Sequence, residues 1–190
     1  MKSRIFFLSI FVLAASFTLT AQSYDFRKTT WGMDSSQVKK AEISRYVLSK
    51  NHGLVYSGKL GDWATNIEYN FTKSNKLFHS AYFISLDSQN PQNYVNAFLL
   101  LQEMLTENYN APYSKKLSTI NGKEITEDEW ASNLISNNLN LETSWKTDET
   151  NIVLSLFRTN DKLYLEINYT SFGNDKEVQE ELKKEILKDL

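Results

Sequence analysis

The stretch Ile152-Val-Leu-Ser-Leu-Phe-Arg-Thr-Asn-Asp-Lys-Leu-Tyr-Leu-Glu-Ile-Asn-Tyr-Thr170 has the pattern of a β hairpin. Apolar residues alternate with other residues in both of its arms, and the polar segment 159–162 separates the arms. A period of two is typical of strands that bury one face, because successive side chains in a strand point to opposite sides. The stretch therefore predicts two antiparallel strands joined by a polar turn.

A similar pattern occurs earlier in the chain. Apolar residues alternate over 67–71, a polar turn follows at 72–76, and the run 77–86 is apolar on both faces. This pattern predicts a second hairpin. The segments 54–59 and 141–146 are predicted as additional strands.

Start signals and helical periodicity predict four helices. Capping boxes mark two starts, where Asp34 and Thr126 are each followed three residues later by Gln or Glu. Asn90-Pro91 begins a long amphipathic helix, which Asn110 and Pro112 end. The predicted helices span about 35–43, 91–110, 127–137 and 174–190.

These elements predict an α+β fold in which antiparallel β hairpins are covered by about four helices. The elements also recur at a nearly constant offset, since the two capping boxes lie 92 residues apart and the hairpin starts 85 apart. An internal duplication and chance spacing explain this offset equally well. We predict a single domain over 22–190, within which 22–113 and 124–190 would be the similar halves and the polar segment 114–123 their linker.

The first 21 residues predict a secretory signal peptide. Lys2 and Arg4 give a positive start, 5–13 is an unbroken run of apolar and small residues, and Ala21 offers a small residue at the cleavage point. The apolar run is too short for a membrane span, which needs about 20 residues. We expect a mature chain that begins near Gln22 and is periplasmic or secreted.

The amino-acid composition excludes several kinds of membrane anchor and binding partner. The chain has no cysteine, so disulfides, thiolate chemistry and a lipoprotein anchor at the cleavage site are excluded. We therefore expect no stable membrane anchor. Without the leader, 19 basic residues face 23 acidic ones, and this mild acidity argues against nucleic-acid binding. The oligomeric state is left open by the sequence.

Motifs for catalysis are sparse. The nucleophile elbow G-x-S-x-G and the glycine-rich phosphate loops are absent. His52 and His79 are more simply explained as surface or half-buried histidines than as a metal pair. Glu68 and Glu166 lie inside predicted strands, and they would form a glycosidase-like carboxylate pair only if the two hairpins faced one another. We predict no catalytic residue, no cofactor and no metal.

Two tryptophans are candidate partner-binding residues. Trp31 and Trp63 flank glycines and polar residues in predicted loops, where a flat ring can stack on a sugar or anchor a protein partner. The alternative is that both rings cover the core at the ends of strands.

The N-terminal pattern Trp31-Gly-Met-Asp-Ser-Ser-Gln-Val-Lys39 resembles the opening of a set of uncharacterised exported bacterial proteins. Its short helix start is also similar to outer-membrane assembly lipoproteins of the SmpA/BamE type and to β-lactamase-inhibitor-like modules. This resemblance implies an α+β module, with helices on an antiparallel sheet, that acts by binding. The absent cysteine departs from the lipoprotein members.

These observations predict an exported, non-enzymatic binding or interaction module of the cell envelope, with an envelope or secreted protein as partner. One alternative is a secreted hydrolase or glycan-processing enzyme that uses carboxylates such as Glu68 and Glu166. The other is a carrier of a small carbohydrate or hydrophobic ligand, which would need a concave pocket lined by Tyr and Trp.

Overall fold

The computed structural model describes residues 24–86, 90–120 and 122–173, together with 178–180, 183–184 and 187. In chain order its elements are α1 (Ser35–Ala41), β1 (Arg45–Lys50), β2 (Gly53–Leu60), β3 (Trp63–Phe71), β4 (Leu77–Ser85), α2 (Pro91–Tyr109), β5 (Ser114–Thr119), a 3-10 turn η1 (Glu127–Glu129), α3 (Trp130–Ile135), β6 (Leu139–Lys146), β7 (Thr150–Thr159) and β8 (Lys162–Ser171). The predicted signal peptide, 1–21, lies outside the described residues and stays a prediction.

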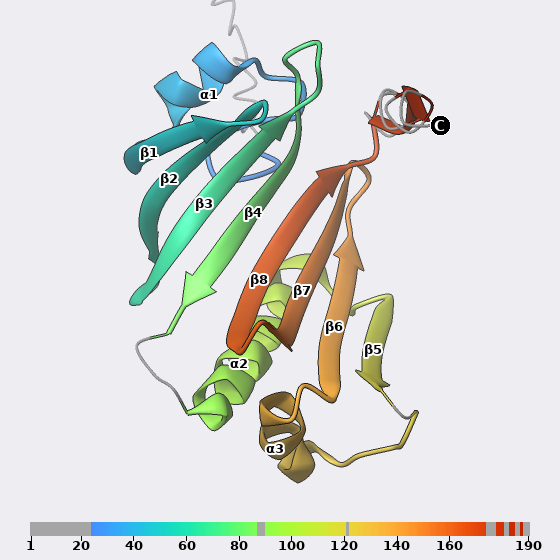
Figure 1. Ribbon diagram of the computed structural model, residues 1–190. Coiled ribbons are helices and arrows are strands. Elements are labelled where there is room, and N and C mark those ends of the chain that lie inside the picture. Colours follow the sequence, from blue (N-terminus) through green and yellow to red (C-terminus); the bar gives the residue numbers. More distant parts are fainter. Residues whose placement is uncertain are drawn as a thin grey trace, which may run out of the picture.

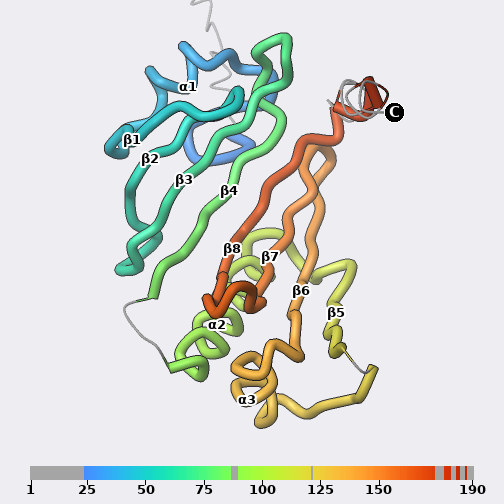
Figure 2. The backbone as a smooth tube through the Cα atoms, in the orientation of Figure 1, coloured from blue at the N-terminus to red at the C-terminus, as the bar shows by residue number. Residues whose placement is uncertain are grey.

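A single antiparallel sheet of eight strands, in the order β1-β2-β3-β4-β8-β7-β6-β5, dominates the molecule (Figure 1). Strands β1 to β4 form one half of the sheet and strands β5 to β8 form the other half, as the tube in Figure 2 shows. The last strands of the two sets, β4 and β8, pair with each other at the centre of the sheet, from His79 opposite Thr170 to Ile84 opposite Leu165. Whether the two sets arose by duplication stays a prediction.

The prediction of antiparallel β hairpins covered by about four helices is wrong, because the sheet dominates the fold. The hairpins join edge to edge into one continuous sheet, and the helices are too short to cover it, since α1 has seven residues and α3 has six. Of the helices that the structure describes in full, only α2, with 19 residues, runs along the sheet, where it packs on β6, β7 and β8. The predicted helix at 174–190 falls mostly outside the described residues. Periodicity reveals a strand but not its neighbour, so the pairing of β4 with β8 was not predictable.

Local signals predicted the hairpins and the starts of α1 and α2 correctly. The helix predicted at 127–137 begins instead with the 3-10 turn η1, and its α-helical part, α3, is Trp130–Ile135. The β7–β8 hairpin turns at Asn160 and Asp161, whose φ values of 48° and 62° are the left-handed pair that a two-residue type I′ turn requires. The Asp34 side chain accepts hydrogen bonds from the backbone N–H groups of Ser36 and Gln37, so the predicted capping box is confirmed. These signals act within a few residues and depend little on the rest of the fold.

Two edge strands were not predicted. β1 follows α1 directly, and β5 occupies the segment 114–119 that we predicted to be a linker. All six residues of β1 are exposed, and β5 is exposed along most of its length. A strand without a buried face shows no apolar alternation, so neither left a period-two signal in the sequence.

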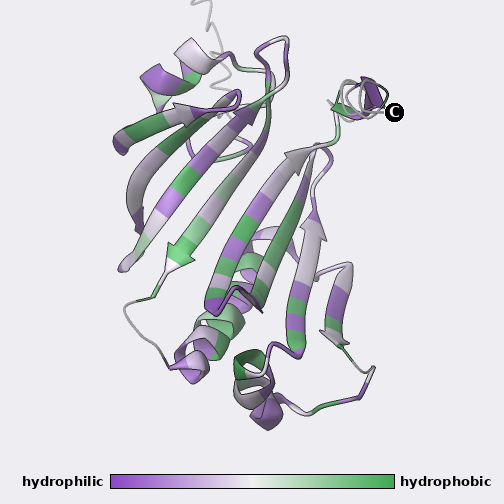
Figure 3. Ribbon diagram, viewed as in Figure 1, coloured by the Kyte–Doolittle hydropathy of each residue, from purple (hydrophilic) through white to green (hydrophobic). Residues whose placement is uncertain are grey.

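The core lies on one side of the sheet, which we call the back face. Figure 3 shows the alternation of hydrophobic and hydrophilic residues along the strands that creates it. The Phe26 ring packs against rings from both halves of the sheet, with centroids 5.4 Å from Tyr69 and 5.0 Å from Tyr169. One hydrophobic cluster thus includes residues of β2 to β4, α2 and β6 to β8.

Candidate functional site

The opposite side of the sheet, which we call the open face, is the candidate functional site. α1, α2 and α3 contribute Val38, Phe98 and Leu134 to the core on the back face, and among the described residues no helix covers the open face. Alternate strand residues therefore stay in contact with solvent. The half-buried residues of the open face are Val55, Ser57, Glu68, Asn70, His79, Phe83, Glu142, Asn151, Val153, Ser155, Phe157, Tyr164, Glu166, Asn168 and Thr170.

A chain of hydrogen bonds crosses the centre of the open face and joins the two halves of the sheet. The Asn70 Nδ2 of β3 lies 3.0 Å from the Nδ1 of His79 on β4. The His79 Nε2 lies 3.1 Å from the Asn168 Oδ1 of β8, and the Asn168 Nδ2 donates to Glu166 Oε1 at 3.1 Å. The hydrogen bonds span the adjacent strands β3, β4 and β8, so they order polar side chains where β4 meets β8.

The network determines the protonation of His79. An amide nitrogen only donates, so the His79 Nδ1 must accept from Asn70 and the proton must sit on Nε2, which donates to Asn168. Burial lowers the pKa of His79 below 6.5, although the hydrogen bond to Asn168 opposes this change. A second proton, on Nδ1, would face the amide hydrogens of Asn70, so the neutral ring is the one that fits.

We expect His79 to make stability depend on pH. Its pKa is lower in the folded chain than in the unfolded one, so between the two values the unfolded chain binds more protons, and stability is lost as pH falls below about 6.5. Urea unfolding at intervals from about pH 5 to pH 7.5 should show this slope in the wild type and not in His79→Gln. The exposed turn residue His52 supplies the control, because His52→Gln should keep the slope. An unchanged slope in His79→Gln would contradict the assignment.

The two carboxylates Glu68 and Glu166 lie on this same face. Glu68 lies opposite Ala81 of β4, and Ala81 lies opposite Asn168 of β8, which is two residues beyond Glu166. Strand spacing therefore puts the α carbons of Glu68 and Glu166 about 12 Å apart. Burial raises the pKa of Glu68; nearby Lys50 opposes the rise, and Glu166 adds to it. Burial also raises the pKa of Glu166. The carboxylates interact across one sheet rather than between two facing hairpins.

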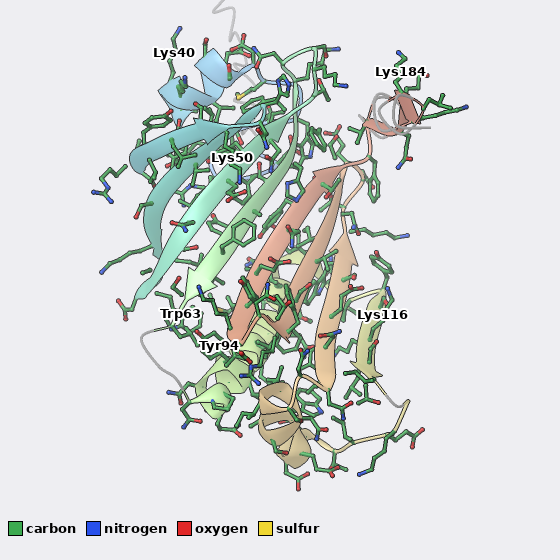
Figure 4. All side chains as sticks on the ribbon, in the orientation of Figure 1. Lys40, Lys50, Trp63, Tyr94, Lys116 and Lys184 are labelled. Atoms are coloured by element: carbon green, nitrogen blue, oxygen red, sulfur yellow. The ribbon has the colours of Figure 1, made fainter. Side chains whose placement is uncertain are left out.

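The structure does not bring the predicted residues Trp31 and Trp63 together. The Trp31 Nε1 donates to the Thr150 Oγ1 at 2.8 Å, and the neighbouring Gly32 N–H bonds to the Leu77 carbonyl, where β4 begins. Trp63 begins β3 at the opposite end of the strands, as Figure 4 shows. Both rings are half-buried and pack against the core. In this structure, both tryptophans cover the core at the ends of strands.

The described cavities lie away from the central network. A depression of about 600 Å³ beside Trp31 is lined also by Phe172 and by the charged residues Lys76, Asp148 and Glu149. Another, of about 490 Å³, lies between the start of α2 and the β7–β8 turn. Neither is lined by Glu68 or Glu166.

A second polar cluster is buried on the back face and has a structural explanation. The Glu42 carboxylate accepts from the Arg27 Nε at 2.8 Å, from the Ser44 N–H at 2.7 Å and from the Tyr69 hydroxyl. Burial alone would raise the pKa of Glu42, but the hydrogen bonds from Tyr69 and Ser44, with the charge of Arg27, lower it below 4.5. This carboxylate joins the end of α1 to β3, and its side chain is only 1% exposed.

Comparison with known proteins finds no matching family model, no similar curated protein and no similar solved structure. The resemblance of the N-terminal pattern to exported modules therefore stays a prediction. Within the described residues, no group of three or more His, Asp or Glu side chains could hold a metal ion. In the same part of the chain, no helix has the length and apolar character needed to cross a membrane.

Sequence reasoning found part of this site. It singled out Glu68, Glu166 and His79, but it assigned them to other arrangements or to no function. It missed Asn70 and Asn168, because an asparagine in a strand is ordinary until its neighbour is known. The available signal was the repeated Glu-x-Asn spacing, Glu68 to Asn70 and Glu166 to Asn168, inside both hairpins.

Proposed function

We propose that the mature chain is an exported, non-enzymatic binding module that docks a folded envelope or secreted protein on the open face. One observation carries the proposal, namely that the eight-stranded sheet packs α1, α2 and α3 on one face, while within the described residues the other face stays in contact with solvent. The predicted signal peptide supports an exported location, because its pattern directs a chain out of the cytoplasm.

The size of the open face suits a protein partner. Eight strands at about 4.8 Å spacing span about 34 Å, and six residues along each strand add about 20 Å, which gives roughly 700 Å². A stable protein interface covers about 800 Å² on each partner. A face of this size exceeds what a small ligand would occupy.

The chemistry of the open face is also that of an interface. Phe83 lies near its centre, and the stacked rings of Phe157 and Tyr164, with centroids 5.3 Å apart, lie at one end of it. Aromatic residues are enriched in protein interfaces, while amides such as Asn151 and Asn168 supply both donors and acceptors. The central hydrogen-bond network holds Asn168 in place together with Asn70, His79 and Glu166 before a partner arrives, which reduces the entropy lost on binding.

Two alternatives receive less support. A hydrolase needs its carboxylates about 5 to 10 Å apart beside a substrate cleft. Glu68 and Glu166 share a face, but they belong to strands separated by β4, and no described cavity involves them. A carrier needs a pocket lined by Tyr and Trp, whereas the depression beside Trp31 is lined largely by charged and small residues.

A pair of arginine substitutions on the open face tests the proposal. Asn66→Arg with Ser155→Arg would place two long charged side chains on the open face, where a docked protein would meet them. The immobilised mature chain would be incubated with envelope and secreted proteins of the producing cell, and the retained partner would then be purified and titrated by calorimetry. We expect the open-face variant to bind that partner at least about tenfold more weakly, a loss of about 1.4 kcal/mol.

The matched control carries two arginine substitutions on α2, which packs on the back face. Asn96→Arg with Asn108→Arg alters exposed positions of α2 and should leave the affinity unchanged. Equal binding by the open-face variant would place the docking surface elsewhere. A small molecule that co-purified with the wild type, with no protein retained, would favour the carrier.

A further inference from the structure

The edge strand β1 presents a second surface that the open face does not explain. It pairs only with β2 and ends the sheet, so its outer backbone N–H and C=O groups have no strand beside them in the described chain. The exposed fractions of Tyr46, Val47 and Leu48 are 49%, 45% and 43%. An apolar edge strand of this kind is a template for pairing with another chain, and most proteins protect such edges.

The two edges of the sheet differ in their protection. β5, at the other edge, carries adjacent lysines, Lys115 and Lys116, and a single exposed apolar residue, Leu117. β1 instead holds three apolar residues in succession. A bulge between Tyr46 and Leu48 interrupts the strand, but Leu48 to Lys50 keep a regular register with β2. The bulge disfavours pairing of β1 with a long, flat strand, but a short extended strand can still pair with the regular part of β1.

The charges around β1 are basic. Arg45 and Lys50 lie at its ends, opposite Ser57 and Gly53, which puts both on the open face together with Lys59 of β2. Lys39 of α1 lies beside the strand, with its Nζ 5.8 Å from the centre of the Tyr46 ring. Over residues 24–86 nine basic residues face five acidic ones, whereas over 90–173 six face eleven. The positive end of the molecule therefore coincides with its unprotected edge.

The same charges argue against a second copy of this chain as the occupant. Two β1 strands in full antiparallel register would place Arg45 of one copy beside Lys50 of the other, and like charges directly opposite are destabilising. An acidic strand would reverse the sign of each contact. It would also retain the backbone hydrogen bonds, which provide affinity in strand addition.

We propose that the β1 edge binds a short extended segment of the partner that carries acidic side chains, which adds to the sheet beside Leu48 to Lys50 and pairs with Arg45 and Lys50. The inference rests on the proposed function and names the chemistry of the partner. It involves the edge of the sheet rather than the centre of the open face, so the two can be tested apart.

The test uses a fluorescein-labelled octapeptide in which glutamate alternates with valine and threonine, titrated with the mature chain and followed by fluorescence anisotropy. We expect saturable binding that weakens with salt, and at least a tenfold loss in the Arg45→Glu/Lys50→Glu variant. A peptide with lysine in place of glutamate, and an acidic peptide with N-methylated backbone amides, should both fail to bind. The Lys115→Glu/Lys162→Glu variant removes two exposed cations from the other half of the sheet and should bind normally.

Three results would overturn the inference. One is no binding of the acidic peptide, and another is equal binding by the Arg45→Glu/Lys50→Glu variant, whose fold would be checked by circular dichroism. The third is a dimer, measured by analytical ultracentrifugation, that the same variant alters, since a second copy would then occupy the edge. Each would leave the docking of a folded partner on the open face unaffected if the Asn66→Arg/Ser155→Arg variant still loses that partner.

Discussion

Replacing Glu42 with alanine should destabilise the protein by about 3 to 5 kcal/mol. The Glu42 side chain is only 1% exposed, and it neutralises the Arg27 guanidinium while accepting from Tyr69 and Ser44. Removing it leaves a partly buried charge and a buried hydroxyl without their acceptor, which costs more than the pair itself contributes. Urea unfolding monitored by tryptophan fluorescence would measure the change.

The matched control is Glu142→Ala. Its carboxylate pairs with the exposed Lys116 at 2.9 Å, and an exposed pair contributes at most about 1 kcal/mol. The pKa of Glu42 is lowered in the folded chain, so its stabilising contribution is present above pH 4.5 and is lost as pH falls through the folded value. The difference between wild type and Glu42→Ala should therefore shrink in acid. Equal effects of the two substitutions at pH 7 would contradict the buried assignment.

Replacing Leu154 with alanine should cost about 2 to 5 kcal/mol. Leu154 is 0% exposed in the centre of β7, where it faces the core beside Ile167 and Thr143 of the neighbouring strands. Truncating it removes apolar contacts and leaves a cavity that the rigid sheet cannot close. Thermal and urea unfolding should both report the loss.

The adjacent residue Val153 supplies the matched control. It lies on the open face and is half-buried, so Val153→Ala should cost less than about 1 kcal/mol. The contrast between neighbouring residues measures directly which side of the sheet holds the core. Similar losses at both positions would mean that the open face is packed, and the proposed docking surface would have to be abandoned.

How much of the candidate site was predictable depends on the range of the interactions that form it. The hairpin of β7 and β8 was predictable, because its alternation and its Asn160-Asp161 turn both lie within the continuous segment Thr150–Ser171. The bond of the His79 ring with Asn168 joins residues 89 positions apart. The Glu-x-Asn repeat marks Asn70 and Asn168, but nothing near His79 or Asn168 in the chain shows that these two residues are neighbours, so their pairing could not be predicted.

The amino-acid pattern was enough to predict the strands with a buried face and the residues where α1 and α2 begin, and the absence of cysteine excludes disulfides and thiolates. These properties follow from side-chain periodicity and from local capping. The pairing of β4 with β8, which joins two sets of strands into one sheet, became visible only in the folded molecule. Backbone pairing between strands is chosen by the packing of the whole core, because that packing favours the register that buries Ile167 and Tyr82 on one face and leaves His79 and Asn168 on the other.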